Sequence, residues 1–457
     1  MIIRNFYEDK LSQASYLIGC AATSVAIVVD PSRDIQQYTE CAELLGLKIV
    51  AVTETHIHAD FLSGTRELGA ATGACIYLSD EGDSDWKYQF ADPAVTLVRD
   101  GDLIRIGNLS LKVIHTPGHT PEHIAFLLTD HPTSEIPHSL LAGDFLFVGD
   151  VGRPDLLELA ANMQGTMEKG ARTLFRSLGK LNDLPDSLLI WPGHGAGSAC
   201  GKSLGGSPVS SLGYERRTNW ELNARNEDSF VNEILSGQPE PPLYFKEMKR
   251  LNKLGPTVLH GLPTVKRVTT ASGQIVDIRS PQSIKASSYR DAVAIPYGKS
   301  FTGWAGWVIR YGEPITLISE NQERADRAAR DLATIGLDSV AAWIVPSSLD
   351  PGRFAAVNSA SSVNLDTSAL ILDVRGLGER RLSHIPGSIH IPFGHLQDRL
   401  EELPRDRKIV VHCASGARSL VAYSILIRAG FKDVHDLAGG ISAIQQESPA
   451  LVCSGAV

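Results

Sequence analysis

Histidine and aspartate residues recur at the ends of strand-like runs in the first half of the chain. His56, His58 and Asp60 occupy alternate positions, so in an extended loop their side chains point to one side. Converging imidazole and carboxylate groups are ligands that proteins offer to zinc or iron. Three later loops each add one candidate of the same kind: His119, Asp144 and His194. A single such histidine is usually an ordinary core or surface residue, but the ordered series predicts a metal site.

A cysteine near the C-terminus is followed at short spacing by a glycine and an arginine. Cys413, Gly416 and Arg418 lie between an apolar run and a helix-like segment. A thiolate at such a turn faces unpaired backbone N–H groups and the positive end of the helix, and both favour the anion. Arg418 adds a donor fork that could hold sulfite or thiosulfate. A buried small hydrophobe is the alternative, but it leaves this spacing unexplained, so the pattern predicts a nucleophilic cysteine.

Short β-rich runs that end in polar or Gly-rich loops carry the metal candidates in the first half, and Pro and Gly mark a boundary near residue 255. The second half contains an internal repeat, in which two segments recur in the same order: 275–279 as 371–375, and 294–298 as 390–394. Apolar strands alternate with helical segments in both copies, which predicts two α/β units with mostly parallel sheets. A linker between them is predicted at residues 350–362.

The composition bounds the class of protein. The 457 residues are 43% hydrophobic, and 43 Lys plus Arg stand against 52 Asp plus Glu, a net charge of -9. This balance argues against a protein that mainly binds nucleic acid or an anionic membrane. Six cysteines without a CxxC pair indicate free thiols, and neither a spanning apolar run nor a secretory signal is found. Among them Cys200 lies near the metal candidates, where a redox or substrate role is an alternative to a core thiol. We expect a cytoplasmic homo-oligomer that binds no nucleic acid or membrane.

The series HxHxD, PGH, GD and PGH resembles the metallo-β-lactamase family. This resemblance implies an α/β fold, a four-layer αββα sandwich, over residues 1–254. In the binuclear hydrolases of this family the first motif reads HxHxDH, whereas Phe61 occupies the last position here. Because phenylalanine cannot bind a metal, the resemblance implies one metal ion rather than two.

Within this family the motifs most resemble those of the persulfide dioxygenases. That resemblance implies one Fe(II) per chain, held by His56, His119 and Asp144, with zinc as an alternative or substitute. Two histidines and one carboxylate leave three positions open, as non-haem iron requires when O2 and substrate bind together. The resemblance also implies residues that orient ligands or contact the substrate: His58, Asp60, His194, Arg217 and Asn219. For the last two, a structural role is an equal alternative.

The Cys413 segment, together with residues 371–375 and 437–441, resembles the active site of the rhodaneses. The resemblance implies a rhodanese domain over residues 361–457, in which Cys413 carries a persulfide and Arg418 assists catalysis. The loop that cradles the sulfur would consist of the residues around them: Ala414, Ser415, Gly416, Ala417 and Ser419.

The first repeat departs from this pattern at the reacting residue. Ser319 stands in place of Cys413, and Gln322 stands in place of the glycine, although Arg324 aligns with the arginine. A serine hydroxyl cannot carry a sulfane sulfur. Residues 257–353 are therefore expected to form an inactive rhodanese-like domain.

These resemblances imply an enzyme of sulfide detoxification. We expect iron-dependent oxidation of a low-molecular-weight persulfide by O2 to sulfite and thiol, coupled to rhodanese transfer that forms or uses thiosulfate. One alternative is a metal-dependent thioester hydrolase resembling glyoxalase II, fused to a sulfurtransferase. Another is a non-enzymatic sulfur carrier or sensor that uses Cys413 alone. Oxygen uptake distinguishes the first alternative, and substitution of His56 distinguishes the second.

Overall fold

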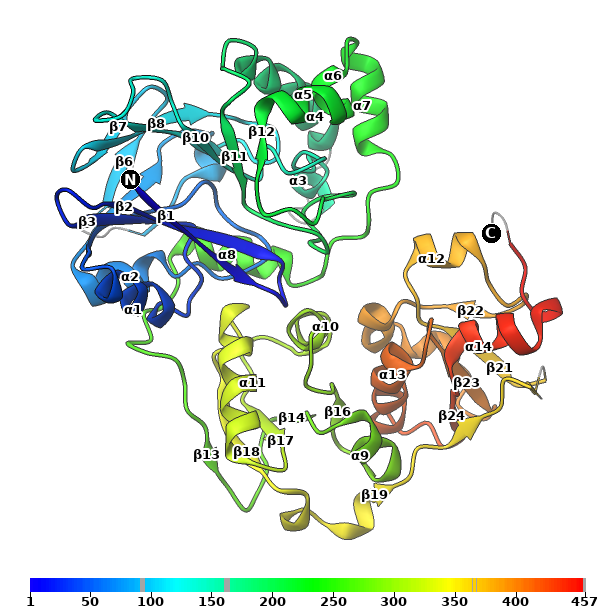
Figure 1. Cartoon of the computed structure of the whole chain (residues 1–457). Helices are drawn as coiled ribbons and strands as arrows, with labels where there is room; N and C mark the ends of the chain where they lie inside the picture. Colours follow the sequence, from blue (N-terminus) through cyan, green and yellow to red (C-terminus); the bar gives the residue numbers. More distant parts are fainter. Residues whose placement is uncertain (91–94, 160–164, 364, 367, 455–457) are drawn as a thin grey trace. The chain divides into compact units, whose positions relative to one another are not determined.

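The chain divides into two compact units (Figure 1). They comprise Met1–Leu262 with Ala333–Gly336, and Pro263–Leu332 with Leu337–Val457. The computed structural model describes residues 1–90, 95–159, 165–363, 365–366 and 368–454. Parts of the predicted 1–254 and 361–457 domains lie outside the described residues: 91–94, 160–164, 364, 367 and 455–457. The division into three domains stays a prediction, because both repeats fall within the second unit.

The first unit begins with a six-stranded sheet in the order β1-β2-β3-β4-β5-β6. The strands β1 to β3 are antiparallel neighbours, whereas β3 to β6 are parallel. Successive side chains of β2 and β3 enter apolar clusters on opposite faces, which is why these strands are continuous apolar runs in the sequence. The strands are β1 Ile2–Glu8, β2 Gln13–Cys20, β3 Val25–Val29, β4 Lys48–Thr53, β5 Cys75–Ser79 and β6 Val95–Val98.

A second six-stranded sheet has the order β12-β11-β10-β9-β8-β7. Its neighbours are antiparallel except for β10 and β11, which are parallel and therefore end at the same edge. Asp144 follows β10 and His194 follows β11 at that edge. The strands are β7 Leu103–Ile106, β8 Leu109–His115, β9 Ile124–Asp130, β10 Ser139–Gly143, β11 Leu189–Pro192 and β12 Ser210–Ser211.

The two sheets share one apolar core, to which Tyr16 of β2 and Phe126 of β9 both contribute. Helices α1 and α2 cover the outer face of the first sheet, and α4 and α7 cover that of the second (Figure 1). This αββα sandwich confirms the predicted fold. The helices are α1 Gln36–Leu44, α2 Thr65–Thr72, α3 Leu156–Leu159, α4 Thr166–Leu178, α5 Leu212–Thr218, α6 Trp220–Asn223, α7 Glu227–Leu235 and α8 Phe245–Leu254.

The second unit contains two five-stranded parallel sheets with corresponding strand orders, β13-β18-β17-β14-β16 and β20-β24-β23-β21-β22. The matching orders confirm the internal repeat and its parallel sheets. In the first copy the strands are β13 Lys266–Arg267, β14 Gln274–Asp277, β16 Val293–Ala294, β17 Ile315–Ile318 and β18 Val340–Ile344. In the second they are β20 Ser359–Ala360, β21 Leu370–Asp373, β22 Ile389–His390, β23 Ile409–His412 and β24 Val434–Leu437.

Short helices and one strand pair complete the second unit. The antiparallel pair joins β15 Ser288–Tyr289 to β19 Phe354–Ala355. The helices are α9 Pro281–Ala286, α10 Phe301–Val308, α11 Gln322–Thr334, α12 Leu377–Leu382, α13 Ala417–Arg428 and α14 Gly440–Glu447. None of the helices in the described residues combines the length and the apolar character needed to cross a membrane.

Candidate metal centre and sulfur-transfer site

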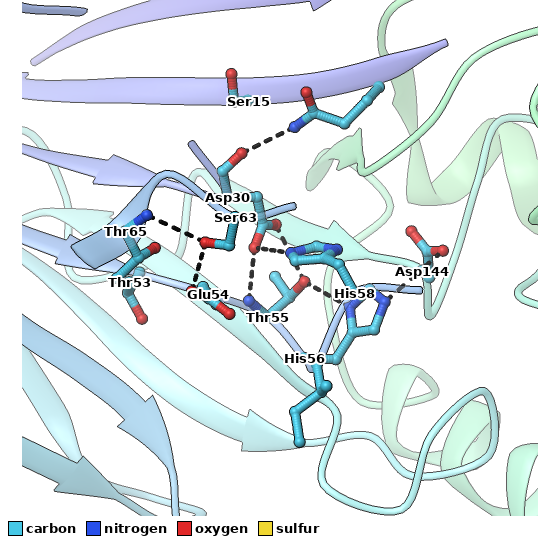
Figure 2. A network of polar contacts seen from close by, with 12 residues as sticks. Ser15, Asp30, Thr53, Glu54, Thr55, His56, His58, Ser63, Thr65 and Asp144 are labelled. Carbon is cyan, nitrogen blue, oxygen red and sulfur yellow. Dashed lines mark hydrogen bonds and ion pairs between the residues drawn. The ribbon is translucent and has the colours of Figure 1, made fainter. Parts of the chain in front are cut away.

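An aspartate that follows β3 holds the loop after β4. Asp30 accepts hydrogen bonds from Thr55 N at 2.7 Å and from Thr55 Oγ1 at 3.0 Å. Because the hydroxyl of Thr55 donates its proton in the hydrogen bond to Asp30, it acts as an acceptor toward Nδ1–H of His56, 3.0 Å away. The other ring nitrogen of His56, Nε2, therefore carries a lone pair, and it faces Asp144 (Figure 2).

His119 and Asp144 are oriented in the same way from other loops. Nδ1–H of His119 donates to the carbonyl oxygen of Arg153 at 3.0 Å, which leaves its Nε2 as a lone-pair donor. The backbone N–H of Asp144 donates to His123 Nε2 at 3.0 Å. Nε2 of His119 and Nε2 of His56 are 3.5 Å and 4.0 Å from Asp144 Oδ2. Three loops thus bring two imidazoles and one carboxylate together.

These three residues fit a metal ion. All three are buried, and their ligand atoms lie within 4.8 Å of one another. Neither carboxylate oxygen of Asp144 accepts a hydrogen bond from the described residues, an arrangement that is costly unless another partner is present. Ligands at about 2.1 Å from one ion lie roughly 3–4 Å apart, and the distances of 3.5 Å and 4.0 Å from Asp144 Oδ2 to the two histidines are of that size. His56, His119 and Asp144 are therefore a candidate metal group.

The protonation states also suit metal binding. Burial lowers the pKa of His56 well below its usual value and lowers that of His119 to about 3, so both rings are neutral near pH 7. Burial raises the pKa of Asp144 to about 6. Its carboxylate is therefore mostly ionised at neutral pH, but the buried charge is unfavourable because it has lost its hydration. A bound cation would offset that cost.

His58 does not join this group. Its Nε2 is 3.0 Å from Asp30 Oδ1, and its ring lies against Phe61 with the centroids 4.3 Å apart. Nδ2 of Asn252 on α8 donates to the carbonyl oxygens of both His58 and Phe61, at 2.7 Å and 2.8 Å. Phe61, which replaces the final histidine of the motif, thus packs against His58. The ring nitrogen of His58 is turned to Asp30 (Figure 2).

A second buried group lies beside the first and includes Asp60, His194 and Cys200. His194 Nε2 is 3.3 Å from Asp60 Oδ2 and 3.4 Å from Asp144 Oδ1, so the two groups are neighbours. Nδ1–H of His194 donates to Ser12 O at 3.0 Å, which again leaves Nε2 as a lone-pair donor. Burial, followed by the charges of Asp60 and Asp144, raises the pKa of the Cys200 thiol. Cys200 is thus placed beside the metal candidates.

The second repeat holds its cysteine at a strand-to-helix turn. Cys413 directly follows β23, and α13 begins four residues later. Gly416 N–H donates to Cys413 Sγ at 3.2 Å, and Ser419 Oγ is 3.7 Å from the same sulfur. Gly416 has φ 100°, a left-handed conformation that a side chain would strain. The loop between them consists of Ala414 and Ser415, and Ala417 is the first residue of the helix.

The arginine of this loop already has a partner. Arg418 Nη1 and Nη2 donate to the two carboxylate oxygens of Glu379 on α12, at 2.6 Å and 2.7 Å. This bidentate pair fixes the guanidinium beside the loop. In this conformation the charge of the Arg418 guanidinium is therefore balanced by the Glu379 carboxylate, and the two N–H groups that face Glu379 are not available to an anion.

The first repeat has no comparable sulfur cradle among its described residues. The hydroxyl of Ser319 donates to the carbonyl of Asn321 at 2.9 Å. Arg324, which aligns with Arg418, donates to Glu320 at 2.6 Å. The residue at the glycine position, Gln322, donates to the carbonyl of Val265 at 2.6 Å. All three side chains are thus bonded to partners within the first repeat.

Comparison with known proteins agrees with both halves of this description. The sequence pattern of the metallo-β-lactamase superfamily matches residues 9–194, and that of the rhodanese-like domain matches residues 360–447. The mitochondrial persulfide dioxygenase ETHE1 of Mus musculus is 30% identical over 234 residues, which are 50% of this chain and 78% of that protein. The chain belongs to the metallo-β-lactamase superfamily. Its C-terminal part is a rhodanese-like domain.

Other members of the superfamily are also similar to the chain. A hydroxyacylglutathione hydrolase of Rhodospirillum rubrum is 34% identical over 179 residues, which cover 39% of this chain and 60% of that protein. A metallo-beta-lactamase of Staphylococcus aureus is 42% identical, with a TM-score of 0.70 over 76% of this chain and 99% of that structure. The latter likeness extends beyond the metallo-β-lactamase match itself.

Like His58, two further predicted residues of the metallo-β-lactamase part, Arg217 and Asn219, lie outside both metal groups. Arg217 is exposed on α5. Asn219 is buried, caps α6 through its side-chain oxygen, and donates from Nδ2 to the carbonyl of Asp150 at 3.3 Å. A contact of either residue with a thiol carrier stays a prediction. The hydrogen bonds of Asn219 are those expected of a structural role, which was the alternative for this residue.

Arg153 is a positioning residue that the motif search missed. Its buried side chain forms a two-bond pair with Asp155, at 2.6 Å and 2.8 Å, and donates to Ala199 O at 3.0 Å. Its carbonyl holds His119, so one residue ties the His119 loop to the segment that carries Cys200. The only sequence signal was its place in the GRPD stretch after Asp144.

Proposed function

We propose that the chain uses one Fe(II) to oxidise a low-molecular-weight persulfide. In this reaction one persulfide, one O2 and one water give a thiol, sulfite and two protons. The observation that carries the proposal is the convergence of two neutral imidazoles and one carboxylate in a buried site. The similarity to a persulfide dioxygenase supports it.

His56, His119 and Asp144 would hold the iron. Fe(II) with these ligands would supply open positions and the electron-transfer chemistry that reaction with O2 requires. Thr55 and Arg153 fix the ring orientations, so the lone pairs are directed before the metal arrives. Such preorganisation limits the reorganisation that binding would otherwise require.

We further propose that Cys413 transfers sulfane sulfur between a persulfide, sulfite and thiosulfate. The thiolate takes the outer sulfur of the donor, so that a Cys413 persulfide forms and the donor's S–S bond breaks. With a thiol persulfide as donor, the leaving group is the thiol. Sulfite then attacks the outer sulfur, which regenerates the thiolate and releases thiosulfate. Every step is reversible, so the same loop can use thiosulfate as a donor. The first repeat, with Ser319, would carry no transfer chemistry.

Metal analysis combined with O2 consumption tests the oxygenase. The full chain, loaded anaerobically with Fe(II), is assayed on glutathione persulfide and coenzyme A persulfide, and sulfite is quantified. The proposal expects one iron per chain and one sulfite per O2. The His56→Ala variant should lose both iron and O2 uptake but keep transfer by Cys413. Iron-loaded protein that consumes no O2 with either persulfide would contradict the proposal.

A second candidate function is metal-dependent thioester hydrolysis. The neighbouring group of Asp60, His194 and Cys200 favours it, because two adjacent ions could activate water. The similarity to a hydroxyacylglutathione hydrolase points the same way. Zinc-loaded protein that cleaves an acylglutathione and consumes no O2 with persulfide would establish this function instead.

A further inference from the structure

A lysine of the first repeat lies beside the cysteine loop of the second. Lys285 belongs to α9, in the repeat that has Ser319 in place of cysteine. Its Nζ is 3.1 Å from Asp436 Oδ2, and a Cβ atom added to Gly416 would lie 3.9 Å from the same nitrogen. The ammonium group therefore stands at the edge of the loop that holds Cys413.

A chain of polar contacts connects this lysine to the sulfur. Ser419 Oγ donates to Asp436 Oδ1 at 2.6 Å, and Ser419 Oγ is 3.7 Å from Cys413 Sγ. The side chain of Asp436 is 3% exposed, whereas that of Lys285 is 43% exposed. Of these contacting groups, the one that solvent and a ligand can reach is thus the positively charged ammonium group of Lys285.

Arg418, the cationic residue of the loop segment itself, is held by two hydrogen bonds. Both terminal nitrogens of Arg418 are bonded to Glu379. Lys285 is also paired with a carboxylate, that of Asp436, but through one contact at 3.1 Å, so among the described residues two of its three N–H donors are not used on that carboxylate. Its side chain is 43% exposed, whereas that of Arg418 is 22% exposed.

Contacts between the repeats fix the position of this lysine. Ile284 of α9 packs in one apolar cluster with Ala294 and with Leu420 of α13. Ala294 N–H donates to Ser424 Oγ, also on α13, at 2.8 Å. The helix that begins at the cysteine loop is therefore held directly against the residues that flank Lys285.

We propose that Lys285 is a specificity-determining residue of the transfer site and binds the SO3 group of two small anions, thiosulfate and sulfite. The repeat without a cysteine thereby completes the binding pocket of the repeat that has one. This inference rests on the proposed transfer by Cys413. In the step with thiosulfate, the Cys413 thiolate bonds to the outer sulfur, the S–S bond of thiosulfate breaks, and sulfite leaves with the electron pair beside the ammonium group.

Steady-state kinetics with two donors of different charge test the inference. Transfer to cyanide is measured with thiosulfate, a dianion, and methanethiosulfonate, a monoanion. We expect Lys285→Ala to lower kcat/KM for thiosulfate about tenfold, mainly through KM, which is the size of one charge-assisted hydrogen bond. The loss for methanethiosulfonate should be smaller, so the ratio of the two donors falls. Lys285→Arg should restore most of it.

The control is Lys432→Ala, which removes an exposed lysine beyond the other end of α13. It should leave both donors unchanged. A Lys285→Ala or Lys285→Gln variant with the donor ratio of the unmodified chain would overturn the inference, and so would equal losses on both donors. If the unmodified chain transfers no sulfur, or if Cys413→Ser still does, the proposed transfer function fails as well.

Discussion

His58 and Asp30 form a buried pair, with Nε2 and Oδ1 3.0 Å apart, and this pair turns Nε2 of His58 toward Asp30 although the ring centroids of His56 and His58 lie 4.2 Å apart. His56 points to Asp144, whereas His58 points to the aspartate after β3 (Figure 2). The same carboxylate also binds Thr55, which orients His56. Asp30 therefore assigns different roles to two histidines that the sequence pattern places on one side.

Substitution of His58 should affect mainly the stability of the fold, whereas substitution of His56 should affect mainly iron binding. His58→Gln removes one partner of a buried charged pair and should lower the free energy of unfolding by about 3 kcal/mol, because Asp30 keeps Thr55 but loses its charged partner. His56→Gln should abolish stoichiometric iron binding. Metal content after dialysis and urea unfolding measure the two effects. Loss of iron from His58→Gln at a temperature where it is folded would show that His58 is a ligand.

The His58–Asp30 pair also predicts a pH dependence of stability. Burial disfavours the charged ring, but the charge and the hydrogen bond of Asp30 outweigh it and raise the pKa of His58 from 6.5 to about 9. When the pKa of a histidine is higher in the folded than in the unfolded protein, protonation stabilises the fold. This stabilisation is complete at pH values below the pKa of the unfolded state, and it is lost as the pH rises through the pKa of the folded state. The stability difference between the unmodified chain and His58→Gln should therefore be constant below about pH 6.5 and shrink toward pH 9. A difference that grows with pH over this range would be inconsistent with the pair.

Removal of the metal should expose the cost of burying Asp144. Because burial raises its pKa to about 6, the ionised carboxylate destabilises the metal-free protein at pH 7.5. Metal-free Asp144→Asn should accordingly be at least as stable as the metal-free unmodified chain. Anaerobic Fe(II) at 100 times its Kd should stabilise the unmodified chain by about 2.7 kcal/mol and leave the variant unchanged. Thermal unfolding with and without iron checks both, and an equal iron response of the two proteins would exclude Asp144 as a ligand.

The two proposed reactions should separate at Cys413. Cys413→Ser keeps the metal group intact, so O2 uptake with a persulfide should persist, while thiosulfate:cyanide transfer should fall to background. Oxygen electrode traces and thiocyanate formation measure the two. Loss of O2 uptake in this variant would mean that the two sites depend on each other.

Much of the fold was predictable because it follows from local patterns. Apolar runs that end in His or Asp became strands that end at one site, and the 96-residue repeat became two sheets with corresponding strand orders. The metal candidates His56, His119 and Asp144 and the Cys413 turn were found because each lies within four residues after the end of such a strand.

The remaining features depend on partners far away in the sequence. Asp30 draws His58 aside across 28 residues, and Glu379 occupies Arg418 across 39. Cys200, in the segment between β11 and β12, joins Asp60, which is 140 residues earlier in the sequence. A motif gives the type and order of such residues, but it does not say which of two partners each side chain takes.

Restoring a cysteine to the first repeat should not restore transfer. Ser319→Cys would place a thiol after β17, but Gln322 stands where Gly416 adopts φ 100° and donates to sulfur. In the first repeat the backbone N–H that donates to Ser319 Oγ is that of Asn321, at 3.4 Å, and Arg324 is held by Glu320. In a Cys413→Ser background, Ser319→Cys should therefore form no thiocyanate from thiosulfate and cyanide. Ser319→Ala in the same background is the matched control, and thiocyanate formation by the cysteine variant alone would show that the first repeat retains a working cradle.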